Sequence, residues 1–306
     1  MKFRLGWAVL VVCVGLSEGC DSGGSKDGGS DGGPPGAGFD AGSDVDAGAD
    51  AGSDAGSDVD AGSDAGSGAC PYAFCEDFDS LDAGVITNGM LVGPWKASVS
   101  GPMTVMQIDS ENAHSGNHAL HVTMVGEQAT DAGLPSRATL NRHTSGGAPL
   151  VAGNDMFGRA EIFFSDAGTS GLAYGTHSWM FSSLGTKPDG GTSNINLGGG
   201  GQKLQFNYHA FADGGEQSVQ GGLVTAGAWH CLQWELNGSG GASPADIAKV
   251  WIDGTLAVDV EMKPGWAFPS AWTTFDFGFN HYQVLHNPVD VYLDDFALNG
   301  AMIPCP

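Results

Sequence analysis

Two residues that can carry protons stand in segments whose side chains alternate as in a β-strand. In residues 273–283, phenylalanines alternate with polar residues. Successive strand side chains point to opposite faces, so burying the phenylalanines turns Asp276, Asn280 and Tyr282 outward. His177 opens a second such segment. Histidine and tyrosine commonly act as general base and general acid, so we predict that His177 and Tyr282 form a proton-transfer pair. A rim histidine packed against a turn and an ordinary strand tyrosine are equally good interpretations.

Amide side chains gather in residues 194–208, which hold Asn194 and Asn207 among others. An amide can hydrogen-bond a polar ligand without supplying charge. The residues predicted to bind a ligand are Asn196, Gln205, Tyr208, Asn280 and Trp179.

Three arginines are the candidates for pairing with an anionic ligand. Arg137 shares a strand face with Thr139 and Asn141 and is the best of them, whereas Arg159 shares a face with Glu161. For each of these arginines, Arg142 included, a structural role is the favoured alternative.

Tryptophan offers a second kind of ligand surface, because exposed indole rings can stack on sugar rings. Trp266 or Trp272, in a loop rich in glycine and proline, could form such a platform. Trp234 and Trp251 occupy alternating strand positions and are predicted to be core residues.

The segments that carry these residues alternate with a period of two, which is typical of β-strands. They are residues 118–125, 157–164, 177–184, 203–208, 229–236, 273–279 and 289–298. Asp253-Gly254 lies between two such segments and suits a type I′ hairpin turn. No helical period persists. The prediction is an all-β, concanavalin A-like jelly-roll sandwich in residues 70–306, preceded by a disordered linker.

The first 69 residues have a different composition. Residues 1–20 combine a basic start with an apolar run too short to span a bilayer, and end at Cys20. This pattern resembles a lipoprotein signal peptide cleaved before Cys20, although ordinary signal cleavage is the alternative. Residues 21–69 consist almost entirely of Gly, Ala, Ser and Asp, with eleven Asp and one Lys, and are predicted to be a disordered tether.

Charge and cysteine usage limit the function further. The chain has 35 acidic and 11 basic residues and a net charge of −24, so a nucleic acid is an unlikely partner and a membrane contact is expected only through the lipid. Cys70, Cys75, Cys231 and Cys305 remain after processing. An even count in an exported protein favours two disulfides over a zinc site, with three possible pairings.

Several motifs, taken in order, resemble a known family. The first four are Phe78-Asp79, Ala113-His-Ser-Gly116, Ile195-Asn-Leu-Gly-Gly199 and Gln202-Lys-Leu-Gln-Phe-Asn207. They are followed by Ala228-Trp-His-Cys231, Phe277-Gly-Phe-Asn-His-Tyr282, Tyr292-Leu-Asp-Asp295 and Ile303-Pro-Cys305. Together they resemble the fungal cellulose-induced secreted proteins and their bacterial relatives, jelly rolls similar to glucuronan and alginate lyases. The resemblance covers about residues 74–306 and leaves out the tether and the signal.

The resemblance implies a polysaccharide cleft on a concave sheet and a Cys231–Cys305 bridge, which leaves Cys70 with Cys75. It also implies a structural calcium ion, with Asp79, Ser115, Asn117 and Asp295 as ligands. For β-elimination of a uronan, His177 and Tyr282 would transfer protons, and Arg137 or Asn196 would hold the carboxylate. Relatives carry a basic residue near Asn196, where this chain has an amide, and this weakens the lyase interpretation.

The sequence therefore predicts a monomeric, exported protein that binds or cleaves polysaccharide. It is expected to be lipid-anchored in the envelope of a Gram-negative bacterium, with secretion as the alternative. The alternatives are a non-catalytic carbohydrate-binding module and an envelope adhesion module. The acidic surface favours a neutral glycan over a uronan.

Overall fold

The computed structural model describes residues 70–101, 103–124, 136–143, 151, 155–165, 178–186, 192–200, 203–210, 215–238, 246–263, 268–269, 271–281 and 289–306. They all belong to one of the two units into which the chain divides, Val59–Pro306. The predicted signal peptide with Cys20, the tether, His177, Tyr282 and Trp266 lie outside the described residues. Within the described part, no helix is long and apolar enough to span a membrane.

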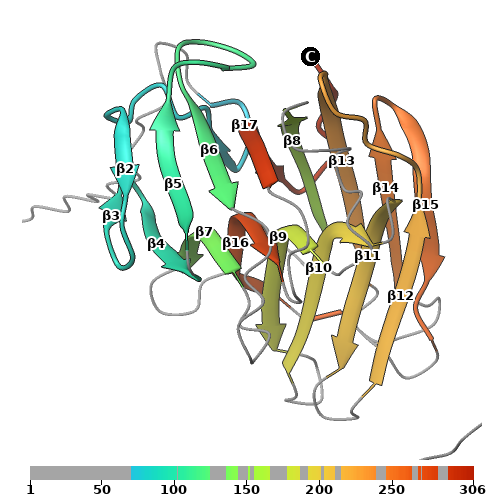
Figure 1. Ribbon diagram of the computed structural model, residues 1–306. Helices are drawn as coiled ribbons and strands as arrows, with labels where there is room; N and C mark the ends of the chain where they lie inside the picture. The colour runs from blue at the N-terminus through green and yellow to red at the C-terminus, as the bar shows by residue number, and fades with distance from the viewer. Residues whose placement is uncertain are drawn as a thin grey trace, which may run out of the picture. The chain divides into compact units, whose positions relative to one another are not determined.

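Every regular element of the described part is a β-strand, and the strands form two antiparallel sheets (Figure 1). The first, named here the β17 sheet, contains β1 (Phe74–Glu76), β2 (Gly84–Ile86), β5 (Thr104–Asp109), β6 (Ala119–Met124), β8 (Met156–Phe164), β13 (Trp229–Asn237), β14 (Ile247–Ile252), β15 (Thr255–Glu261) and β17 (Val289–Asn299). The second, the β16 sheet, contains β3 (Leu91–Val92), β4 (Trp95–Ser100), β7 (Ser136–His143), β9 (Ser178–Thr186), β10 (Thr192–Gly200), β11 (Lys203–Ala210), β12 (Gly215–Gly221) and β16 (Ala271–His281).

The strand order places elements distant in sequence side by side. The β17 sheet runs β15-β14-β13-β8-β17-β6-β5-β2, with β1 also paired to β17. The β16 sheet runs β12-β11-β10-β9-β16-β7-β4-β3. In each sheet the C-terminal strand, β17 or β16, is therefore central, and the predicted all-β jelly-roll sandwich is confirmed.

The core lies between the sheets and is rich in aromatic rings. Phe275, Phe277 and Phe279 are all about 1% exposed, as the alternation predicted. Phe277 packs on Phe296 of the opposite sheet, with ring centroids 4.3 Å apart. Burying a phenylalanine contributes about 1.5–3 kcal/mol, so these rings join the two sheets firmly.

The strongest local sequence signal is also confirmed. Asp253 and Gly254 have φ angles of 50° and 73°, and they connect β14 to β15. A type I′ turn needs positive φ at both central positions, and this explains the Asp-Gly pair.

Both predicted disulfides are present. Cys70 is bonded to Cys75 and Cys231 to Cys305, with Cα–Cα distances of 5.9 and 6.0 Å. The second bridge ties β13 to the C-terminal segment that follows β17.

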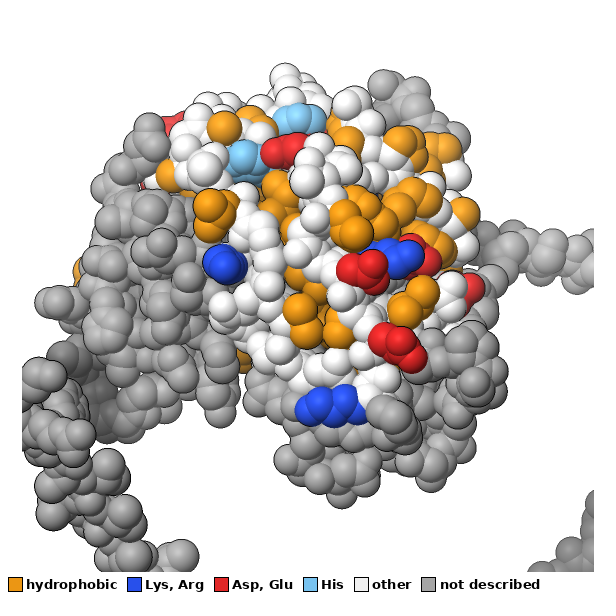
Figure 2. Space-filling view, turned by 90° about the vertical axis from the view of Figure 1, so that its right-hand side faces the viewer, with side chains coloured by type: hydrophobic (Ala, Val, Ile, Leu, Met, Phe, Trp, Pro, Cys, Tyr) orange, Lys and Arg blue, Asp and Glu red, His pale blue; other side chains and the backbone are white. Residues whose placement is uncertain are grey.

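On one side of the sandwich, β12 of one sheet lies against β15 of the other. Hydrophobic side chains gather on this side, with acidic and basic side chains around them (Figure 2). Leu223, after β12, is 61% exposed, and Leu256 on β15 is 47% exposed.

Candidate functional site

The outer face of the β16 sheet carries polar side chains in rows that cross the strands. The first row follows the register between strands β4, β7, β16, β9, β10, β11 and β12. It consists of Lys96, Asn141, Asp276, Ser182, Asn196, Asn207 and Ser218. The residues between them along each strand, such as Leu140, Phe277 and Leu197, are in the core.

A second row lies beside the first on the same face. Its members are Ser100, Arg137, Asn280, Trp179, Gly198, Gln205 and Gln220. The two rows together are called the polar face below. Arg137, Asn280, Trp179, Gln205 and Asn196, five of the residues predicted for the site, therefore come together on it.

Trp179 reaches this face because of a β-bulge in β9. Met180 and Phe181 are both core residues, so the alternation shifts by one position, and Trp179 becomes the partner of Gly198 and Asn280. Gly198 packs directly on the backbone of Ser178 and leaves no room for a Cβ atom. The glycine thus permits the close strand approach that the bulge requires.

Several amides of the polar face are almost inaccessible, yet not all are satisfied. Asn196 and Asn280 are 3% and 5% exposed. The Oδ1 atoms of both residues have no hydrogen-bond partner among the described residues. A buried, unpaired acceptor costs about 1–3 kcal/mol, so each of these two oxygens would gain from a donor that reaches it when neighbouring side chains move. Gln205 differs, since its Oε1 accepts a hydrogen bond from Gln220 Nε2 at 3.0 Å.

The charge on the polar face is nearly balanced around Arg137. Its Nη2 lies 3.4 Å from Asp276 Oδ2, and the Nε atom is buried with no partner in the described part. Asp276 therefore neutralises much of the positive charge that a ligand carboxylate would need. This geometry favours a polar, uncharged ligand over a strongly anionic one.

The other two candidate arginines take structural roles. The Arg142 guanidinium lies over the Phe74 ring, 4.4 Å from its centroid, away from the polar face. Arg159 donates hydrogen bonds to the carbonyl oxygens of Pro304 and Asp295. The alternative of a structural role is correct for both.

Two aromatic predictions need correction. Tyr208 is fully buried in the core and packs on Phe268, with centroids 6.0 Å apart. It alternates with Asn207 along β11, so the two cannot share a face. Trp272 is likewise fully buried and cannot form a surface platform.

One histidine beside the polar face was not among the residues predicted from the sequence. His209 is half-buried and faces Asn194 across the β10–β11 pair. The alternation of Gln205, Asn207 and His209 along β11 was the signal that could have found it. His177 and Tyr282 lie outside the described residues; they are the sequence neighbours of Ser178 and His281, which pair across β9 and β16.

The predicted calcium ligands converge on the segment of residues 115–118. Asp79 Oδ1 accepts hydrogen bonds from the backbone N–H groups of Asn117, at 2.6 Å, and His118, at 2.9 Å. Ser115 Oγ donates to Asp295 Oδ1 at 2.7 Å. Two carboxylates, Asp79 in the turn after β1 and Asp295 on β17, thus hold the same segment, and their oxygen atoms have the chemistry that calcium prefers.

The adjacent buried acid carries an electrostatic penalty. Asp294 is fully buried and accepts hydrogen bonds from the backbone N–H groups of His114, Ser115 and Asp295. Burial, with the charge of Asp295, raises the pKa of Asp294 to about 8. The described residues contain no group of three His, Cys, Asp or Glu side chains placed to hold a metal ion. Calcium therefore remains a prediction for this corner.

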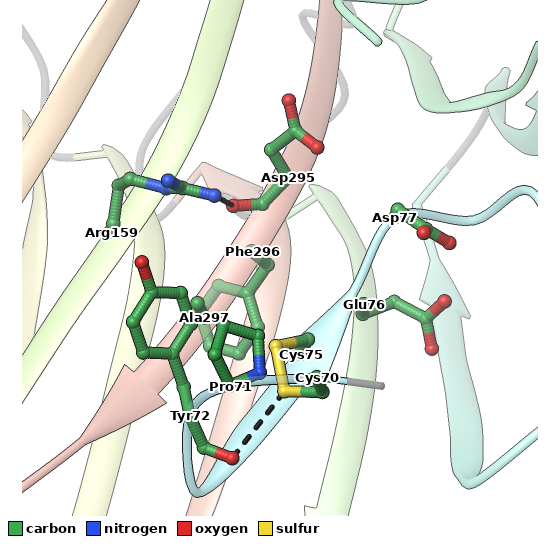
Figure 3. A pocket seen from close by; sticks show the side chains of 10 residues that line it. All are labelled: Cys70, Pro71, Tyr72, Cys75, Glu76, Asp77, Arg159, Asp295, Phe296 and Ala297. Atoms are coloured by element: carbon green, nitrogen blue, oxygen red, sulfur yellow. Dashed lines mark hydrogen bonds between the residues drawn. A yellow bond between two sulfur atoms is a disulfide. The ribbon is translucent and has the colours of Figure 1, made fainter. Parts of the chain in front are cut away.

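A surface hollow of about 280 Å³ lies beside the Cys70–Cys75 bridge, and Figure 3 shows it from close by. Tyr72 and the disulfide form one side, and Arg159 reaches across to the backbone oxygen of Asp295. Since that guanidinium is already bonded to two carbonyl groups, the hollow offers no free cation.

Neither known protein families nor curated proteins match the chain. Among solved structures, Cip1, a cellulose-induced protein, is 19% identical over 76% of this chain and 100% of its own, with a TM-score of 0.51. Endo-β-1,4-glucuronan lyase from the fungus Trichoderma reesei is 14% identical over 75% of this chain and 96% of its own, with a TM-score of 0.53. The resemblance stated from the motifs is confirmed, and at these identities it shows the fold.

Proposed function

We propose that residues 70–306 form a polysaccharide-binding domain whose polar face holds a neutral sugar chain. The observation that carries this proposal is the pair of buried, unpaired amide oxygens of Asn196 and Asn280. An acceptor without a partner requires a donor, and sugar hydroxyl groups are donors. A uronan also has hydroxyl donors, so the preference for a neutral chain comes from the pairing of Arg137 with Asp276, which leaves little positive charge for a carboxylate.

The layout of the face supports the same ligand class. The two rows span seven strands about 4.8 Å apart, so the face is long enough for several sugar units. Trp179 stands in the row of Asn280 and supplies a ring on which a sugar can stack. The fold shared with Cip1 and a glucuronan lyase is compatible with this use.

The test is a binding experiment with the full chain and a panel of insoluble and soluble neutral glycans. The double variant Asn196→Ala/Asn280→Ala should weaken binding by about tenfold or more, since each lost hydrogen bond contributes about 0.5–1.5 kcal/mol. Asn299→Ala is the matched control, because Asn299 lies on β17 of the other sheet. Equal binding by the double variant and the native chain would exclude the polar face as the site.

A second candidate function is β-elimination of a uronan, favoured by the position of Arg137 opposite Asn280 on the polar face. In this reaction His177 would take the C5 proton, and the electron pair of the broken C5–H bond would form the C4–C5 double bond. The C4–O bond would break, with Tyr282 protonating the leaving oxygen and Arg137 holding the carboxylate.

The unsaturated product absorbs ultraviolet light, which gives a direct assay on a panel of uronans. His177→Ala and Tyr282→Phe should each abolish the signal, while Arg137→Gln should raise KM. If the native chain releases no unsaturated product from any uronan, elimination is excluded and binding of a neutral glycan stands alone.

The proposal includes export and anchoring through Cys20, with residues 21–69 as a tether of roughly 40 Å between membrane and domain. Metabolic labelling with a fatty acid tests it directly. We expect label on the native chain and none on Cys20→Ser. Absence of label on the native chain would show ordinary signal cleavage and secretion instead.

A further inference from the structure

The outer face of the β17 sheet carries a row of its own, on the side of the sandwich opposite the polar face. Following the register from β2 through β5, β6, β17 and β8 to β13, one residue of each strand contributes. The row is Val85, Gln107, His121, Tyr292, Phe163 and Trp229. Residues next to them along the strands, such as Val122, Leu293 and Ile162, are in the core. We call this set the aromatic row.

The four rings of the aromatic row, on β6, β17, β8 and β13, contact one another in series. The His121 and Tyr292 rings stack, with centroids 3.9 Å apart and planes 13° apart. Phe163 lies 6.1 Å from Tyr292 and 5.5 Å from Trp229. His114 continues the series at 5.3 Å from Trp229. Such a chain of touching rings forms a rigid surface, so a ligand does not have to order it on binding.

Part of this surface is open. Trp229 and Phe163 are half-buried, whereas His121 and Tyr292 are more than nine-tenths buried and support them. Val85, at the other end, is 60% exposed, and Val105 beside the row is 38% exposed. The row crosses six neighbouring strands and spans about 24 Å. Its open apolar groups are Trp229 and Phe163 at one end and Val85 at the other, with Gln107 and the two buried rings between them.

Acidic side chains lie beside the middle of the row and beside its Trp229 end. Asp109 and Asp290 each form an ion pair with His121, and Glu111 is exposed beside them. Hydrogen bonds from His121 lower the pKa of Asp290 and, against the effect of burial, also that of Asp109, so both carry charge at neutral pH. At the Trp229 end, Asp295 pairs with His114, whose ring contacts Trp229. Asp253 pairs with His230, the residue after Trp229.

We propose that the aromatic row is a second glycan-binding site, distinct from the polar face, that takes a polysaccharide whose sugar units carry protonated amines. Sugar rings would stack on Trp229 and Phe163, and the amines would lie in the negative potential of the bordering carboxylates. A cation over an aromatic face gains from the ring quadrupole, and the acids add a longer-range attraction. The same acids would repel a uronan.

The site fits a glycan better than another partner. An extended sugar chain presents flat faces at a spacing comparable with the distance between strands. The neighbouring strands β8 and β13 present the partly exposed rings of Phe163 and Trp229 at this spacing. The row does not overlap Asn196 or Asn280, which lie on the other sheet. One domain could therefore hold two chains, or cross-link them.

The experiment measures binding of chitosan oligosaccharides to the full chain by titration calorimetry at low and high salt. We expect affinity to fall as salt rises, and Trp229→Ala to weaken binding by about tenfold. Trp251→Ala is the matched control: Trp251 is a half-buried tryptophan of the same sheet that pairs with Gln233 and Leu256 outside the row. If Trp229→Ala lowers the melting temperature strongly, Trp229→Phe keeps a ring in place and should show a smaller loss of affinity.

Four results would overturn the proposal. Equal affinity for the N-acetylated, uncharged oligosaccharide would remove the role of the amines. Equal binding of polylysine would show a general cation surface without sugar recognition. An equal effect of Trp251→Ala and Trp229→Ala would place the site elsewhere. Loss of binding in Asn196→Ala/Asn280→Ala with Trp229→Ala unaffected would assign the amine-bearing glycan to the polar face instead.

Discussion

Replacing His121 with phenylalanine should destabilise the β17 sheet, most strongly at mildly acidic pH. His121 is 8% exposed and bridges three strands: its Nδ1 lies 2.8 Å from Asp109 Oδ2, and its Nε2 lies 2.6 Å from Asp290 Oδ1. Phenylalanine keeps the stacking on Tyr292. The substitution therefore removes the two pairs of His121 with Asp109 and Asp290, called the polar clamp below, and little of the packing.

The size of the effect follows from burial. Removing one partner of a buried ion pair costs about 3–5 kcal/mol, and the 30% exposure of the Asp290 side chain places this case near the lower end, at about 3 kcal/mol. For a domain of this size, that corresponds to a fall of about 6–12 °C in Tm.

The pH dependence has a definite sign. Burial alone would lower the pKa of His121, but Asp290 and Asp109 raise it overall. A raised histidine pKa gives stability that is complete below the unfolded value of about 6.5 and is lost as pH rises through the folded value. The pKa values of both aspartates are lowered, so their contribution appears above the unfolded value of about 3.9. The clamp therefore contributes most between these two limits.

Thermal and urea unfolding at about pH 5.5 and about pH 9 measures the difference, which should shrink at the higher pH. His230→Phe is the matched control: His230 Nδ1 pairs with Asp253 at 2.7 Å, but the Asp253 side chain is 53% exposed, so the loss should stay below about 1 kcal/mol. A destabilisation of His121→Phe that is the same at both pH values would refute the clamp and leave packing as the explanation.

Three further predictions concern stability. Replacing Cys231 and Cys305 by alanine opens a loop with a sequence separation of 74 and should cost about 4 kcal/mol, measured by urea unfolding; an unchanged midpoint would contradict this. Adding Ca²⁺ should raise Tm and a chelator should lower it in the native chain, with no response in Asp295→Asn; a native chain indifferent to both would refute the calcium prediction. Gly158→Ala should lower Tm by several degrees, because the Cβ atom of the alanine would collide with the Trp234 ring. Gly254→Ala, with open space around the added Cβ atom, tests the separate cost of positive φ.

Much of the fold was predictable because strand periodicity is a local property. The faces of Asp276 and Asn280, the Asp253-Gly254 turn and the core phenylalanines all follow from alternation within one segment. The Tyr208 error was avoidable on the same ground, since alternation along β11 separates it from Gln205 and Asn207.

The rows of the two sheets could not be predicted in the same way. The aromatic row joins His121 to Tyr292 and Phe163 to Trp229, and each pair is far apart in sequence. Strand order decides such neighbours, and it depends on which long-range pairings bury the most apolar surface. Trp179 shows the same limit, because its face depends on a bulge that the packing of Gly198 permits.

The sequence by itself determined that this chain builds strands, that residues 21–69 differ in composition from residues 70–306, and which cysteines and amides were available. The tertiary structure decided which cysteines pair, which side chains share a surface and which hydrogen-bonding atoms remain unsatisfied. The physical reason is the sequence separation over which each interaction acts. Alternation and turn chemistry act within a few residues, whereas a binding surface of a sandwich is assembled from strands that meet only after folding.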